Sequence, residues 1–185
     1  MKNTLLLIVL LTAIISCDKS TTQADLCEGV ICNNGGNCVN GDCACPPQYT
    51  GPDCGQEKVP VKMRTGSISL VSFPLTDANG AGWDVFDGPD IFIQITQGST
   101  VIYTSGFIED LTIGHTYTDM VEFTSPQATY TVSVWDYDDG LTAPDLLGSV
   151  NFTPYQSGLN FPTFRPIQCS GCTVALSLNN ITYTH

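Results

Sequence analysis

The chain has 185 residues, with 18 Asp and Glu against six Lys and Arg, and a formal net charge of -12. From Gly66 onward its only Lys or Arg is Arg165. Such a surface repels nucleic acid and anionic lipid, so we expect no nucleic-acid partner, and it favours divalent cations. The length suits one small module followed by a β-sandwich of roughly 100 residues.

The first residues have the pattern of an export signal. Lys2 precedes a largely apolar run from Leu5 to Ile15, and the small Ser16 stands before Cys17. The run is too short and wrongly flanked for a lasting membrane span. Residues 1–16 are therefore predicted to be a secretory signal peptide.

The end of this signal, Ile14-Ile15-Ser16-Cys17, resembles the lipobox of bacterial lipoproteins. The resemblance implies that Cys17 becomes the lipidated first residue of the mature chain, with residues 17–25 as its tether. We therefore expect an exported protein whose lipid anchor inserts into a membrane. Its expected location is the cell envelope, at the outer membrane or cell surface. The alternative is an ordinary cleaved signal in which a Cys occupies this position by chance.

The nine cysteines form three groups. Cys17 belongs to the anchor, six lie from Cys27 to Cys54, and Cys169 and Cys172 stand near the end. An even remainder in an exported chain indicates disulfides. Large aliphatic residues are few between Cys27 and Cys54, so cross-links must hold this segment together in place of a hydrophobic core.

Six cysteines within residues 26–55, with Gly35-Gly36 before the third and Tyr49-Thr50-Gly51 before the sixth, resemble an EGF-like module. Fifteen pairings of six cysteines are possible. The resemblance implies the disulfides Cys27 to Cys38, Cys32 to Cys43 and Cys45 to Cys54. The acidic pattern that some members use for calcium is incomplete before Cys27, so a rigid spacer or a protein-contact module is favoured here.

Residues 56–61 are predicted to be a short linker, because they are polar and contain Pro60. From residue 62 onward, runs rich in Val, Ile, Tyr, Phe and Thr alternate with turn residues, which is typical of strands. We expect hairpin turns at Gln97-Gly98-Ser99 and Ser125-Pro126-Gln127. Residues 62–185 are therefore predicted to form an all-β, antiparallel, eight-stranded sandwich. Seven candidate strands can be placed, at 62–73, 91–97, 100–104, 116–123, 129–135, 146–153 and 173–183.

The acidic loop after the 129–135 strand is the most informative stretch. Tyr130, Val132 and Val134 fall on one face, because side chains of a strand alternate. Asp136 and Asp138 continue the same parity. The two carboxylates therefore project the same way where the buried face ends, and they repel each other unless a cation lies between them.

A second acidic loop runs from Asp77-Ala78-Asn79-Gly80 to Pro89-Asp90. With Asp136-Tyr137-Asp138 and Asp145-Leu146-Leu147-Gly148 it resembles the loops of a C2 domain, over residues 62–185. The first loop is longer than usual in that family, so Asp84 is an alternative to Asp90 as a ligand. The resemblance implies calcium binding by the carboxylates of Asp77, Asp90 or Asp84, Asp136, Asp138 and Asp145.

Calcium is the favoured ion on chemical grounds as well. It takes six to eight oxygens in a tolerant geometry, whereas zinc prefers Cys and His. In an exported module we expect weak affinity, on the order of 10⁻⁴ to 10⁻³ M. The alternative is that these aspartates only form turns by accepting hydrogen bonds from their own backbone.

Apolar residues also stand in the acidic loops: Trp83, Val85 and Phe86 in the first, and Leu141 and Pro144 in the later one. One interpretation is an apolar loop tip beside the metal that contacts a partner or a bilayer. The other is that the first loop's aromatic residues fold back over the end of the sandwich.

Cys169-Ser170-Gly171-Cys172 is predicted to be a local disulfide, because neither a redox nor a zinc context accompanies it. No pattern of an activated nucleophile is visible, so we expect no enzyme. The sequence thus predicts a lipid-anchored protein that binds or adheres to a protein, glycan or lipid ligand in a calcium-dependent way. An envelope assembly subunit with calcium only stiffening its loops is the alternative, and a hydrolase is a weaker one.

Overall fold

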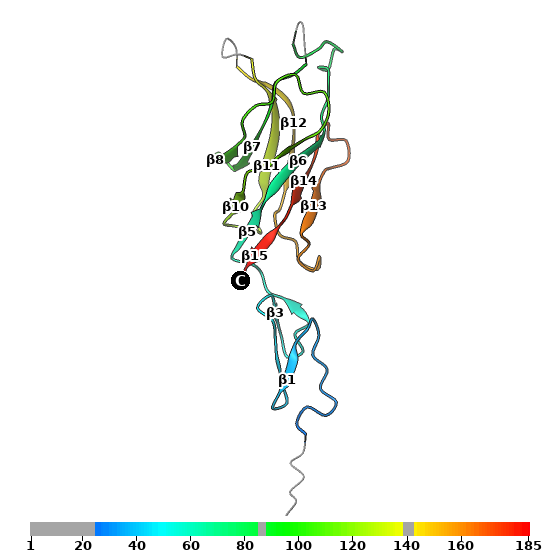
Figure 1. Ribbon diagram of the computed structural model, residues 1–185, viewed down its shortest axis with the longest axis vertical. Helices are drawn as coiled ribbons and strands as arrows, with labels where there is room; N and C mark the ends of the chain where they lie inside the picture. Colours follow the sequence, from blue (N-terminus) through cyan, green and yellow to red (C-terminus); the bar gives the residue numbers. More distant parts are fainter. Residues whose placement is uncertain (1–24, 85–87, 139–142) are drawn as a thin grey trace, which may run out of the picture.

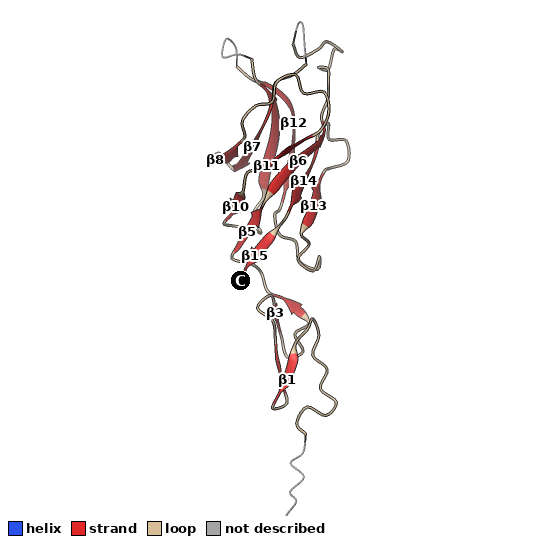
Figure 2. Cartoon of the chain, viewed as in Figure 1, coloured by secondary structure: helices blue, strands red, loops and turns tan. Residues whose placement is uncertain are grey.

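The computed structural model describes residues 25–84, 88–138 and 143–185. These residues form strands, turns and loops and contain no helix (Figure 2). Across them, no helix is therefore long and apolar enough to span a membrane. The predicted signal peptide, Cys17 and most of the tether lie outside the described residues.

The N-terminal module consists of two short antiparallel hairpins. β1 (Asn37–Val39) pairs with β2 (Asp42–Ala44), and β3 (Tyr49–Thr50) pairs with β4 (Gln56–Glu57). The turn Asn40-Gly41 joins β1 to β2, and its two residues have φ values of 53° and 95°. Positive φ at both central residues is what a type I′ hairpin turn requires.

Three disulfides hold this module. They join Cys27 to Cys38, Cys32 to Cys43 and Cys45 to Cys54, the pairs that the EGF-like resemblance implied. Cys54 is fully buried, so its disulfide occupies the place that a hydrophobic core has in larger domains.

One layer of the sandwich is the antiparallel sheet β12-β11-β7-β8 (Figure 1). Alternate residues of β7 and β11 are buried, as expected of strands with one face on a core. The predicted hairpin joins β7 to β8, with a φ of 58° at Gly98. The strands are β7 (Ile91–Gln97), β8 (Thr100–Thr104), β11 (Tyr130–Asp136) and β12 (Asp145–Phe152).

The other layer is the sheet β13-β14-β6-β9, which continues as β10-β5-β15. Three predicted strands, 62–73, 116–123 and 173–183, are each interrupted once in this layer. With the two parts of each counted together, the described residues of the sandwich form eight strands, the predicted number. The segments are β5 (Lys62–Thr65), β6 (Ser67–Ser72), β9 (His115–Tyr117), β10 (Val121–Phe123), β13 (Phe164–Ile167), β14 (Ala175–Asn179) and β15 (Thr182–Thr184).

The interruption of two of these strands follows from a close contact at Gly66. The Gly66 NH donates to the carbonyl of Asn179 at 3.0 Å, and Asn180 has a left-handed φ of 52°. A Cβ on Gly66 would lie 3.0 Å from Asn180 Cβ, so a larger residue would crowd the turn. The segment β13 is not among the predicted strands. It lies at the edge of the sheet, where its Pro166 is tolerated.

The hydrophobic core lies between the layers and contains Phe123, Tyr130 and Phe152, with ring centroids 5.1 to 6.1 Å apart. The predicted hairpin at Ser125-Pro126-Gln127 is wrong. The turn is present, with the Ala128 NH donating to Ser125 O at 2.9 Å, but it carries the chain from β10 in one layer to β11 in the other.

The EGF-like module contacts the sandwich through Glu57, in the segment predicted to be a linker. Its carboxylate accepts hydrogen bonds from the hydroxyl of Tyr155 at 2.8 Å and the main-chain NH groups of Gly158 and Asn160 at 2.9 and 2.7 Å. Tyr49 adds a 2.7 Å hydrogen bond to Asn160 Oδ1. In Figure 1 the module lies at one end of the sandwich, and the loops after β6 and β11 lie at the other.

Candidate metal site

Strand β11 positions two of the candidate ligands. Tyr130, Val132 and Val134 are buried in the core, and Asp136 follows in the same direction with its side chain fully buried. Asp138 is half-buried just beyond the strand. The predicted parity is therefore present, and a charged group lies at the end of an apolar face.

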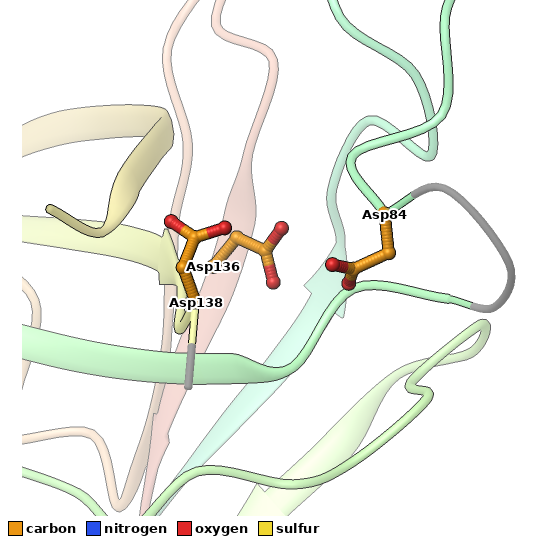
Figure 3. A group of neighbouring side chains, drawn as sticks. All are labelled: Asp84, Asp136 and Asp138. Atoms are coloured by element: carbon orange, nitrogen blue, oxygen red, sulfur yellow. The ribbon is translucent and has the colours of Figure 1, made fainter. Parts of the chain in front are cut away.

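The third carboxylate comes from the loop between β6 and β7. The indole NH of Trp83 donates to Pro74 O at 2.9 Å, and its ring packs against the core. This fixes the chain immediately before Asp84. Asp84, Asp136 and Asp138 each place one carboxylate oxygen within 4.8 Å of the others (Figure 3).

Two oxygen atoms in this cluster lack protein donors. Asp136 Oδ1 accepts a 2.6 Å hydrogen bond from the Asp90 NH. Asp136 Oδ2 and Asp138 Oδ2 are buried and have no hydrogen-bond partner among the described residues. A buried carboxylate oxygen without a donor costs roughly 1 to 3 kcal/mol or more, which a bound cation would offset.

The electrostatic surroundings of Asp136 also favour a bound cation. Burial, followed by the negative charges of Asp84, Asp138 and Asp90, raises the pKa of Asp136 to about 6, although the hydrogen bond from Asp90 opposes the rise. The site thus disfavours its own negative charge. The donor set consists of carboxylate oxygens, which suits a hard cation such as calcium.

Asp77 is not a member of this cluster. Its carboxylate accepts hydrogen bonds from the main-chain NH groups of Asn79 and Ala81, both at 2.8 Å. The bond from Ala81, with that from the Asn79 side chain, holds the pKa of Asp77 below its usual value. Asp77 therefore acts as a turn former, which was the alternative interpretation of these aspartates.

Asp90 and Asp145 also lie outside the cluster of three. The carboxylate of Asp90 accepts a 3.0 Å hydrogen bond from the Asp110 NH. Asp145 pairs with Asp136 in the ladder between β11 and β12, but its side chain is exposed. Of the alternatives in the first loop, the structure places Asp84 and not Asp90 with Asp136 and Asp138.

Of Trp83, Phe86 and Leu141, the structure describes Trp83 alone. Trp83 folds back, half-buried against the core, as the second interpretation of the loop stated. Phe86 and Leu141 lie outside the described residues.

Two features of the site are absent from the sequence predictions. Asp110 Oδ1 accepts a 3.1 Å hydrogen bond from Gly88, and Phe107 stacks on Tyr137 with ring centroids 4.7 Å apart. Phe107 and Asp110 lie in the segment between β8 and β9. No periodic pattern in the sequence predicts that this segment lies close to the acidic loops. At the other end of the chain, Cys169 and Cys172 form the predicted local disulfide.

Comparison with known proteins gives an EGF-like domain over residues 27–54, by a family model. Curated protein sequences gave no match.

Solved structures similar to the chain include C2 domains. One C2 domain is 14% identical, with 67% of this chain and 98% of that chain covered and a TM-score of 0.45. A C2 domain of plant extended synaptotagmin 1 is 13% identical, with 69% and 97% covered and a TM-score of 0.43. A C2 domain protein from Ramazzottius varieornatus is 16% identical, with 65% and 91% covered and a TM-score of 0.36. Residues 27–54 are thus similar to an EGF-like domain, and strand order and register show that an all-β sandwich follows them.

Proposed function

We propose that the sandwich is a calcium-dependent binding module whose ion lies between Asp84, Asp136 and Asp138. The observation that carries the proposal is Asp136: its side chain is fully buried, one oxygen has no donor among the described residues, and two further carboxylates lie beside it. A buried carboxylate of this kind is stabilised by protonation or by pairing with a cation.

Calcium is proposed over magnesium and zinc because of the type of donor atom and the positions of the donors in the fold. Asp136 ends strand β11, Asp138 lies just beyond it, and Asp84 comes from a separate loop. The resulting geometry is irregular, which calcium tolerates and octahedral magnesium does not. The cluster contains neither Cys nor His, the ligands that zinc prefers. Main-chain carbonyls and water would complete the coordination.

We further propose that the protein is exported, is anchored through Cys17, and binds a protein, glycan or lipid ligand at the calcium loops. The placement of those loops at the end of the sandwich away from the EGF-like module supports presentation away from the anchored end (Figure 1). A binding role is proposed over an enzymatic one, because the clustered groups are carboxylates suited to holding a cation.

Calorimetric titration of calcium tests this proposal on the mature chain with Cys17→Ser, which removes the proposed lipid site. The wild-type loops should bind calcium saturably, with a dissociation constant on the order of 10⁻⁴ to 10⁻³ M. Asp138→Asn should weaken binding at least about tenfold. The control Asp42→Asn, on exposed β2, removes the same charge far from the site and should leave binding unchanged. Equal binding by wild type and Asp138→Asn would refute the proposed site.

A structural role for the ion is the second candidate, favoured by the burial of Asp136 inside the protein. In that case calcium would raise the melting temperature, and partners recovered by cross-linking would be the same with calcium and with chelator.

A further inference from the structure

We propose that Asp90 is not a calcium ligand but the positioning residue that orients Asp136 toward the ion, an inference that rests on the proposed calcium function. Three contacts of Asp90 carry it: one from its main-chain NH, one to its main-chain carbonyl and one to its side chain.

The main chain of Asp90 fixes the Asp136 carboxylate. The Asp90 NH donates to Asp136 Oδ1 at 2.6 Å, and the Tyr137 NH donates back to the Asp90 carbonyl at 2.9 Å. The second bond extends the β7–β11 ladder, in which Asp136 pairs with Ile91. With Oδ1 held in this way, the buried Oδ2 is the atom left for a cation.

One oxygen of the Asp90 side chain accepts a hydrogen bond from a neighbouring loop. This oxygen, Oδ1, accepts the Asp110 NH at 3.0 Å, and Asp110 Oδ1 in turn accepts the Gly88 NH at 3.1 Å. The Leu111 NH donates to Pro89 O at 2.9 Å, so the loop that contains Asp110 is bound to the whole 88–90 segment. Asp110 has a left-handed φ of 51°, a region that Asp adopts more readily than most residues.

The main-chain and side-chain hydrogen bonds of Asp90 together connect Gly88, through Asp110 and Asp90, to Asp136. A residue used in this way contributes to metal affinity by holding a ligand and not by donating an oxygen to the ion. Loss of such an outer contact typically weakens metal binding about 10- to 100-fold. Asn can replace Asp90 in this role, because its amide oxygen still accepts the Asp110 NH.

The experiment uses terbium, a luminescent substitute for calcium, on the mature chain with Cys17→Ser. Calorimetry gives the calcium affinity, and terbium lifetimes in H₂O and D₂O give the number of water molecules on the ion. Asp90→Ala should raise the calcium dissociation constant about 10- to 100-fold while the number of bound waters stays at the wild-type value. Asp90→Asn should restore most of the affinity, and Asp110→Ala, which keeps the donating NH but loses the bond from Gly88, should show an intermediate loss.

The alternative outcomes separate the two proposals. If Asp90 is a ligand, Asp90→Ala gains coordinated water and Asp90→Asn loses as much affinity as Asp136→Asn; either result overturns the positioning role alone. If wild type binds neither calcium nor terbium saturably, the proposed function fails, and the positioning role with it. A purely structural role would lower the melting temperature of Asp90→Ala in chelator without changing the affinity of the folded protein, which also contradicts the proposal.

Discussion

Asp136 and Asp145 are direct partners in the ladder between β11 and β12, yet Asp136 is fully buried and Asp145 is exposed. The ladder therefore brings two carboxylates to the same end of the sandwich in different surroundings. A charge that is shielded from water interacts strongly with an ion, and an exposed one is screened.

From this contrast we expect Asp145→Asn to change calcium affinity much less than Asp136→Asn. The two variants remove the same charge at paired positions, so each is the other's matched control. Titration calorimetry at physiological salt measures both. Equal losses would mean that Asp145 turns inward to the ion.

Removal of the buried charge should have opposite effects with and without calcium. In chelator, Asp136→Asn should be more stable than wild type by about 1 to 3 kcal/mol, since it removes a buried group repelled by Asp84, Asp138 and Asp90. In calcium, the wild type should be the more stable of the two. Denaturant unfolding under both conditions measures this, and a variant less stable than wild type in both would show that the carboxylate is held by protein contacts alone.

Calcium should raise the free energy of unfolding of the wild-type protein. At a calcium concentration of about 100 times the dissociation constant, the gain for one site is about 2.7 kcal/mol. Thermal melts in calcium and in EGTA measure it, with magnesium as the ion control. Equal melting temperatures in calcium and in EGTA would argue against an occupied site.

The pH dependence of the junction between the modules should depend on Glu57. Burial raises the pKa of Glu57, but the hydrogen bonds from Tyr155, Gly158 and Asn160 outweigh it and hold the pKa below 4.5. Because the folded pKa is depressed, the stabilisation is present above pH 4.5 and is lost as the pH falls through the lower folded value.

We therefore expect Glu57→Gln to lower the free energy of unfolding near neutral pH by about 1 to 3 kcal/mol and to remove this acid dependence. Glu28→Gln, an exposed substitution in the same module, is the control. Unfolding curves at a series of pH values report both. An unchanged acid dependence in Glu57→Gln would show that the junction contributes nothing to stability.

The disulfides should differ in importance. Replacement of Cys45 and Cys54 by Ala should unfold the EGF-like module, because loss of a disulfide in a small disulfide-rich domain costs about 2 to 5 kcal/mol. Replacement of Cys169 and Cys172 should have a smaller effect, since that bridge closes a loop with a sequence separation of only 3. Limited proteolysis of the two double variants distinguishes them, and equal resistance to protease would contradict this ranking.

Much of the fold follows from local patterns, and the departures have local causes. Period-two burial in β7 and β11 follows directly from the sequence, as does the turn at Gly98. The interruption at Gly66 depends on a neighbouring strand's turn at Asn180, which a single segment does not encode. The turn at Ser125 is correctly located but crosses between layers, because a turn signal does not say which strands will pair.

The candidate site divides in the same way. Asp136 and Asp138 are predictable from strand parity, since they follow a buried alternating run. The choice of Asp84 over Asp90 depends on the path of a long loop, which Trp83 fixes by folding back onto the core. The part played by Asp110 depends on contact between loops far apart in the sequence.

The most direct test of the account is a crystal structure of the mature chain grown in calcium, with an anomalous map to locate the ion. We predict an ion with the carboxylate oxygens of Asp84, Asp136 and Asp138 at about 2.3 to 2.6 Å, and with Asp90 still bound to Asp110. A crystal in which these three carboxylates hold no ion at millimolar calcium, or in which the ion lies on Asp77 and Asp145 without Asp136, would contradict the account.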